Sequence, residues 1–176
     1  MTTLTVDIRN AEPRDAAAIA DVHHDAWAGA YAGIIPHKAL SAMLNRRGRD
    51  WWANAIRRAA TIIVIEVGGK VCGYATLGRN RARGLKQQGE IYELYLRPEC
   101  QGIGLGTRLF AEARRRLSGH GLKGLVVWAL EDNGNALSFY TGAGGRELHV
   151  LDLLATDQQR IEHRRADDDR GAVLVV

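Results

Sequence analysis

A glycine-rich segment between a strand-like run and a helix-like run limits the folds open to this chain most strongly. Residues 101–109 read QGIGLGTRL. They follow the apolar run IYELYL at 91–96 after four intervening residues, and they overlap the start of an amphipathic run over 105–117. Glycines let a backbone approach a ligand closely, and the first N–H groups of a helix face outward at its positive end. Strand, glycine turn and helix in this order predict an α/β fold with a site for a phosphate group.

The two best-known phosphate loops do not fit this segment. A P-loop requires a Lys followed by Ser or Thr after its last glycine, whereas Thr107 follows Gly106 directly. A dinucleotide fingerprint that starts at Gly102 requires a glycine at the sixth position, which Thr107 occupies. Taken alone, the segment leaves open an ordinary glycine turn without a ligand.

A second segment gives the glycine turn a context. The pattern Gln101-x-x-Gly104-x-Gly106 resembles the acyl-CoA loop of the GCN5-related N-acetyltransferase (GNAT) superfamily. Downstream, Asn133-x-x-Ala136-x-x-x-Tyr140 resembles the segment that opens the next helix in that superfamily. The resemblance covers roughly residues 5–150. It implies an α/β acyl-CoA N-acyltransferase fold, with a central, mostly antiparallel mixed sheet, splayed fourth and fifth strands, and flanking helices.

The resemblance also implies which residues would bind acetyl-CoA, the expected co-substrate. The glycine loop would bond the pyrophosphate, the main chain of the fourth strand would pair with the pantetheine arm, and Asn133 would contact the same arm. A helix cap is the alternative role for Asn133. The implied binding residues are Leu94, Tyr95, Leu96, Gln101, Gly102, Ile103, Gly104, Leu105, Gly106, Thr107 and Asn133.

Acetyl transfer to an amine requires a base and benefits from an acid. An alkyl ammonium is mostly protonated at neutral pH, so a carboxylate is useful to deprotonate it. Glu93 is the first candidate, because it lies in the expected fourth strand just before the position that the resemblance implies for the thioester. Strand alternation places it with Tyr95 on the face opposite Glu90, which is the alternative. By resemblance, Tyr140 would protonate the leaving thiolate. Cys100 is a poor nucleophile candidate because no His lies in either motif.

The acceptor is the least defined part of the expected reaction. In the resembling superfamily the early helices shape the acceptor pocket, which makes Trp27 and Tyr31 candidates for substrate binding, with core packing as the alternative. Gly145 stands where the superfamily often has Phe, so a specific acceptor is not implied. The expected acceptor is the primary amine of a small molecule. The alternatives are a protein N-terminus or lysine, or a non-catalytic module that binds or senses CoA.

Composition limits the other classes of protein. The length of 176 residues predicts a single domain over 1–176. The chain has a net charge of +4, but its basic residues are too scattered along the sequence to indicate nucleic-acid binding. No apolar run approaches the roughly 20 residues of a membrane span, and no secretory signal is evident, so we expect a cytoplasmic protein. Cys72 and Cys100 lack metal-ligand spacing, and no metal is expected. Exposed apolar residues at 172–176 would permit strand exchange in a homodimer.

Hydrophobic periodicity and turn residues predict the order of the elements. Strands are expected over residues 6–10, 61–67, 70–77, 90–96, 124–130 and 147–154. Helices are expected from about residue 13 to residue 30 and over 37–45, 47–59, 105–117 and 135–140. The resemblance implies one further strand at the end of the chain, from 158–169 or from 172–176, and the sequence does not decide between them.

Overall fold

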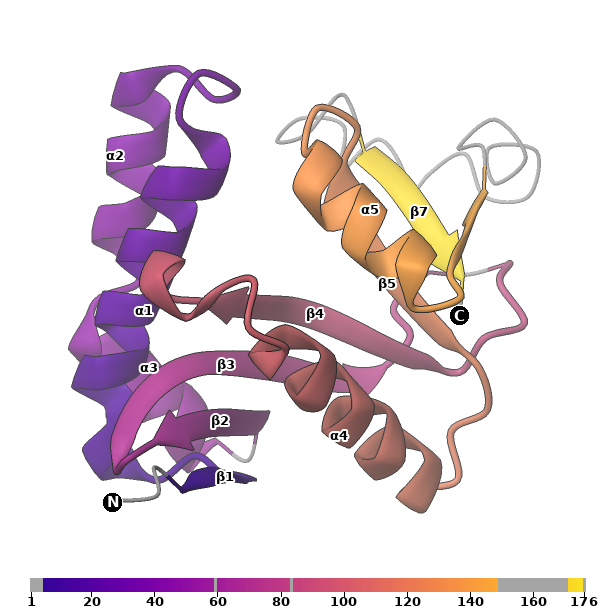
Figure 1. Ribbon diagram of the computed structural model, residues 1–176, viewed down its shortest axis with the longest axis horizontal. Helices are drawn as coiled ribbons and strands as arrows, with labels where there is room; N and C mark the ends of the chain where they lie inside the picture. Colours follow the sequence, from indigo (N-terminus) through magenta and orange to yellow (C-terminus); the bar gives the residue numbers. More distant parts are fainter. Residues whose placement is uncertain (1–4, 59, 83, 149–170, 176) are drawn as a thin grey trace. The chain divides into compact units, whose positions relative to one another are not determined.

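A computed structural model describes residues 5–58, 60–82, 84–148 and 171–175 (Figure 1). The chain forms two compact units, one of residues 1–77 with 93–116 and one of residues 78–92 with 117–176. Strands β3 (Lys70–Arg79) and β4 (Gly89–Leu96) contribute to both units. The single domain expected from the sequence stays a prediction.

The sheet of the first unit starts with three antiparallel strands. β1 (Val6–Asn10) pairs with β2 (Thr61–Val67), and β2 pairs with β3. The β2–β3 connection is the glycine pair predicted as a hairpin turn. Gly68 and Gly69 have φ of 56° and 80°, the left-handed values that a tight two-residue hairpin needs. The predicted bounds of β1 and β2 are confirmed, and β3 runs two residues further than predicted.

Four helices belong wholly or mainly to the first unit: α1 (Ala16–Tyr31), α2 (His37–Arg46), α3 (Arg49–Arg57) and α4 (Leu105–Gly119). The helix expected from residue 13 begins as a short 3-10 turn, Pro13–Asp15, before α1. The helix expected over 47–59 is shorter, because the extended backbone of Gly48 caps α3 and separates it from α2.

The core of the first unit lies between α1, α3 and one face of the sheet. Strand alternation turns every second residue of β2 toward these helices and the others toward the opposite face, where Figure 1 shows α4. Burial of this apolar surface is the main stabilising contribution to such a layered fold. The buried core residues on the α1 and α3 side include Ile19, Val22, Trp52, Ala53, Ile62, Val64 and Tyr74.

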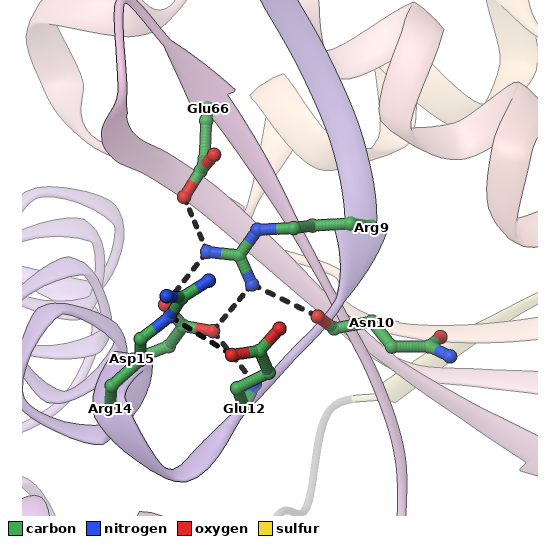
Figure 2. Close-up of polar contacts among 6 residues, drawn as sticks. All are labelled: Arg9, Asn10, Glu12, Arg14, Asp15 and Glu66. Atoms are coloured by element: carbon green, nitrogen blue, oxygen red, sulfur yellow. Dashed lines mark hydrogen bonds and ion pairs between the residues drawn. The ribbon is translucent and has the colours of Figure 1, made fainter.

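Arg9, a residue of β1, connects its own strand and the neighbouring β2 to the turn that precedes α1 (Figure 2). Its guanidinium donates to both carboxylate oxygens of Asp15, at 2.7 and 2.9 Å, and to Glu66 of β2 at 2.5 Å. Burial alone would raise the pKa of Asp15, but hydrogen bonds from Arg9 and from the Glu12 backbone outweigh it and lower that pKa. The network therefore fixes the position at which the chain enters α1.

The second unit contains β5 (Leu125–Leu130), α5 (Gly134–Gly142), β6 (Arg146–Leu148) and β7 (Gly171–Val175). The start of β4 pairs in parallel with β5, from Gly89 opposite Leu125 to Ile91 opposite Val127. β7 pairs antiparallel with β5 and with β6. The strand expected at 172–176 is therefore observed, as β7. Residues 149–170 lie outside the described residues, and they include most of the predicted strand 147–154 and all of 158–169.

The strand order of the complete sheet is β1-β2-β3-β4-β5-β7-β6. The parallel pair β4–β5 stands beside the antiparallel pairs β1–β2, β2–β3, β5–β7 and β6–β7, so the sheet is mixed, and helices flank it. This is the predicted fold class. The glycine segment follows β4 and a 3-10 turn, Pro98–Cys100, and it ends where α4 begins.

Candidate active site

The glycine segment has the backbone that an anion site needs. Gly102 and Gly104 have φ of 74° and 84°, a region that residues with a Cβ rarely adopt. A Cβ added at either glycine would meet no atom within 4 Å, so both face open space. The first helical bond of α4 runs from Arg108 N–H to the Gly104 carbonyl at 3.2 Å. The N–H groups of Leu105, Gly106 and Thr107 therefore belong to the first turn, beside an open surface.

Gln101 fixes the start of this segment. Its side-chain amide donates to the Leu96 carbonyl at 3.1 Å, and its backbone N–H donates to the Pro98 carbonyl at 3.2 Å. The side chain of Gln101 thus holds the glycine turn against the end of β4. Ile103 is 70% exposed, an unusual position for a large apolar side chain.

The segment of β4 expected to pair with pantetheine lies close to β3. A Cβ on Gly73 would come within 2.7 Å of the Tyr95 carbonyl, so glycine is required there by the close approach of the two strands. Leu96 is buried, whereas Leu94 and Tyr95 are half-buried. The ring of Tyr95 lies against aromatic side chains of α1 and β3.

We call these side chains the aromatic cluster. Trp27 and Tyr31, both predicted to bind substrate, are neighbours on α1 with ring centroids 4.9 Å apart. The Tyr31 hydroxyl is hydrogen-bonded to that of Tyr95 at 2.8 Å. Tyr31 is buried and Trp27 is half-buried, so Trp27 has more surface left for a ligand. The cluster consists of His23, Trp27, Tyr31, Trp52, Tyr74 and Tyr95.

Glu93 lies beside this cluster. Its carboxylate accepts from the Tyr74 hydroxyl at 3.2 Å and forms an ion pair with Arg47, the residue that follows α2. The Glu93 side chain is only 12% exposed, and that of Arg47 is 34% exposed. No sequence motif marked Arg47, Tyr74 or His23 as a site residue. Neither Arg47 nor Tyr74 lies in a motif, and their sequence separations from Glu93 exceed what local patterns can relate.

His23 completes a chain of hydrogen bonds toward Glu93. Its Nδ1 lies 2.8 Å from the Tyr74 hydroxyl. Because that hydroxyl donates to Glu93, it accepts from His23, which assigns the His23 proton to Nδ1. Burial, with smaller contributions from the charges of Arg47 and His24, lowers the pKa of His23 to about 3, so the imidazole is neutral at physiological pH. Burial, then the charge of Glu93, raises the pKa of Tyr74.

Glu90, the alternative base, has a different environment. It is completely buried and forms an ion pair with Arg81 at 2.7 Å. The backbone N–H of Arg81 also donates to Glu90 at 2.8 Å, and the Arg81 guanidinium lies over the Tyr92 ring at 4.0 Å. These contacts use the Glu90 carboxylate to close the loop between β3 and β4.

The second unit carries the other predicted site residues. Asn133 caps α5, because its side-chain oxygen accepts from Ala136 N–H at 3.2 Å. This is the capping role that the sequence left as an alternative to CoA contact. Tyr140 lies two helical turns later on the same side of α5, 6% exposed and against the Phe139 ring at 5.1 Å. The helix ends near Tyr140, whose carbonyl accepts from Gly145 N–H at 2.8 Å.

A metal site would need a cluster of ligating side chains, and a membrane span would need a long apolar helix. Within the described part of the chain, His, Cys, Asp and Glu side chains nowhere gather in threes that could hold a metal ion. Over the same residues, every helix falls short of the length and apolar character needed to cross a bilayer.

Comparison with known sequences identifies relatives. Residues 20–144 match the model of the acetyltransferase (GNAT) family. The N-acetyltransferase YuaI of Bacillus subtilis is 33% identical over 128 residues, which cover 73% of each chain. A mycothiol acetyltransferase of Streptomyces bingchenggensis is 29% identical over 73% of this chain but only 41% of its own length. A spermidine N(1)-acetyltransferase of Thermoplasma acidophilum is 22% identical over 78% of this chain and 86% of its own.

Comparison with solved structures supports the same fold. The PaiA N-acetyltransferase from Thermoplasma acidophilum, crystallised with coenzyme A, matches with a TM-score of 0.77. The match covers 97% of this chain and 98% of that one, at 18% sequence identity.

Proposed function

Since the chain belongs to the acetyltransferase (GNAT) family and is an acyl-CoA-dependent N-acetyltransferase, we propose that its acceptor is the primary amine of a small molecule. The acetyl group moves directly from acetyl-CoA to this amine within a ternary complex. The single observation that carries the proposal is the open glycine turn at the start of α4, in a chain of this family. The cytoplasmic location and the homodimer expected from the sequence stay parts of the proposal.

The glycine turn and α4 would hold the phosphates of acetyl-CoA. Left-handed backbone at Gly102 and Gly104 leaves the surface beside the first turn of α4 free of side-chain atoms. N–H groups of residues 104–107 can then bond phosphate oxygens, and the helix dipole adds attraction of roughly 0.3–1 kcal/mol per charge. Acetyl-CoA supplies the thioester, whose carbonyl carbon receives the amine.

Glu93 would prepare the acceptor amine. The ammonium loses a proton to the Glu93 carboxylate, directly or through water, and the freed nitrogen attacks the carbonyl carbon. The Tyr74 hydroxyl, fixed by His23, orients this carboxylate through its hydrogen bond. The nitrogen–carbon bond forms, the carbon–sulfur bond breaks, and an amide results.

Tyr140 would complete the reaction by giving its phenolic proton to the leaving thiolate, so that CoA departs as a thiol. Its position on α5, seven residues after the cap Asn133, matches the family pattern. As the carbon–sulfur bond breaks, the nitrogen loses a second proton to solvent. The proton that Glu93 accepted also returns to solvent, and Tyr140 regains its proton from solvent, so the net reaction releases one proton. Atoms and charge balance without a covalent enzyme intermediate.

The test is release of CoA thiol from acetyl-CoA with a panel of small amines and, separately, with peptides that carry a free N-terminus or lysine. Faster release with small amines supports the proposal. Release with peptides alone would make the protein a protein acetyltransferase. Tight binding of acetyl-CoA without release across both panels would make it a CoA-binding module.

A further inference from the structure

The Arg47–Glu93 ion pair is a pair of opposite charges within the candidate acceptor site. Arg47 lies in the two-residue connection between α2 and α3, and its guanidinium contacts the Glu93 carboxylate. The Arg47 guanidinium also lies over the Trp51 ring, 4.8 Å from the ring centroid, and Trp51 is 43% exposed. The pair is therefore closed on the Glu93 side and reached from solvent on the Arg47 side.

The aromatic cluster beside this pair is neutral. The aromatic cluster consists of tyrosines, tryptophans and His23, which stays uncharged at physiological pH because burial lowers its pKa to about 3. The Tyr74 phenol also keeps its proton, because its pKa is raised. Together with this cluster, the pair presents one positive and one negative charge to a ligand.

A plain ammonium would gain little at such a site. To reach Glu93 it must displace Arg47, and the guanidinium then loses its carboxylate and faces a second cation. A molecule with its own carboxylate beside the amine avoids this cost, because its ammonium can face Glu93 while its carboxylate faces Arg47. Arginine is well suited to that second contact, since its guanidinium can bond both oxygens of a carboxylate.

We propose that the acceptor is zwitterionic, an α-amino acid or a similar compound whose primary amine lies next to a carboxylate that Arg47 binds. This inference rests on the proposed function, since it names the acceptor class of the same site. Arg47 is then a specificity-determining residue: it pairs with Glu93 when the site is empty and with the acceptor carboxylate when the site is occupied. Polyamines are poor acceptors.

The test compares amino acids with the amines that lack their carboxylate. The pairs are L-methionine with 3-(methylthio)propylamine, L-leucine with isopentylamine and L-phenylalanine with 2-phenylethylamine, with spermidine as a polycation. CoA release gives kcat/KM for each compound with the wild type, Arg47→Gln, Arg47→Lys and Arg46→Gln. Arg46 is the exposed neighbour of Arg47, so Arg46→Gln makes the same charge change outside the site.

The decisive quantity is the change in the amino acid to amine ratio of kcat/KM, because an α-amino group is intrinsically less basic than an alkyl amine in every variant. We expect the ratio to fall about 10- to 100-fold in Arg47→Gln, as loss of a charge-assisted contact predicts, mainly through KM of the amino acid. Arg47→Lys should keep part of the preference, and Arg46→Gln should keep all of it. General structural damage would instead lower both classes of substrate together.

An unchanged ratio in Arg47→Gln, or spermidine as the best acceptor of the wild type, would overturn the zwitterion inference and leave the acetyltransferase proposal intact. If no compound is acetylated although acetyl-CoA binds, calorimetry of the same amino acids with the CoA-bound protein decides. Amino acid binding that is lost in Arg47→Gln would uphold the inference and count against the proposed chemistry. Absence of amino acid binding would overturn the inference.

Discussion

The Tyr74 hydroxyl donates a hydrogen bond to Glu93 at 3.2 Å and accepts one from His23 Nδ1 over 2.8 Å. Tyr74 is fully buried, so neither bond competes with water. Through this hydroxyl, a residue of α1 and a residue of β3 fix one oxygen of the carboxylate that we assign as the base. The other oxygen contacts Arg47.

Replacing Tyr74 by Phe removes this connection while keeping the ring. The change leaves His23 Nδ1 without its partner, which should destabilise the fold by roughly 1–3 kcal/mol. We expect kcat/KM to fall about tenfold. The low-pH side of the plot of kcat/KM against pH should also shift, because the Glu93 carboxylate loses a hydrogen bond. Urea unfolding and a pH–rate profile measure the two effects separately. A profile that keeps its shape would show that Tyr74 is only part of the core.

Glu93→Gln tests the base directly, and Glu90→Gln is its matched control on the same strand. If Glu93 accepts the amine proton, its amide should lower kcat by about 10²–10⁴-fold, most strongly at low pH where the amine is protonated. Glu90→Gln should instead lower stability, because it breaks a buried ion pair with Arg81. A rate loss in Glu90→Gln with a normal unfolding curve would transfer the role of base to Glu90.

Tyr140→Phe tests the proposed acid. The phenol is needed only when the thiolate leaves, so turnover should fall roughly 10²–10⁴-fold while acetyl-CoA affinity stays the same. Steady-state CoA release and calorimetry on the same preparation measure both quantities. Phe139→Leu on the adjacent position of α5 controls for loss of ring packing. Equal turnover in wild type and Tyr140→Phe would remove the acid role.

His23 predicts a pH dependence of stability. Its pKa is about 3 in the folded protein, below the ordinary value of 6.5, so protonation favours the unfolded chain. Its contribution is complete above pH 6.5 and is lost as pH falls toward 3, by at most about 1.4 kcal/mol per pH unit. Urea unfolding between pH 7 and pH 4.5 should show a shallower slope for His23→Phe than for the wild type. Parallel slopes would mean that His23 is accessible to protons in the folded state.

Local patterns in the sequence predicted most of the fold. β1 and β2 have the predicted bounds because β-branched residues and a glycine pair at 68–69 define strands and a hairpin over short distances. Gly48 was not recognised as a break, since its effect depends on one extended residue between two helices. The position of the last strand did not follow from local patterns, because residues 171–175 form a strand by pairing with β5, which ends more than forty residues earlier.

The candidate site was less predictable than the fold. Glu93 and the glycine loop lie inside motifs, and the sequence identified both. Arg47 and His23 reach Glu93 only because α1, α2 and α3 pack beside β3 and β4, so tertiary structure determines their role. Asn133 shows the opposite case, because its cap on α5 is a local interaction that composition already allowed.

Binding of acetyl-CoA tests the central claim most directly. Calorimetry should compare the wild type with Gly104→Asp, which puts a negative charge and a strained residue at the start of α4, and with Gly119→Asp. Gly119 ends the same helix, faces open space and has ordinary φ, so its variant carries the same charge change without the strain. We predict binding by the wild type and Gly119→Asp and its loss in Gly104→Asp. Undiminished binding by Gly104→Asp would contradict the assignment of the acyl-CoA site to this glycine turn.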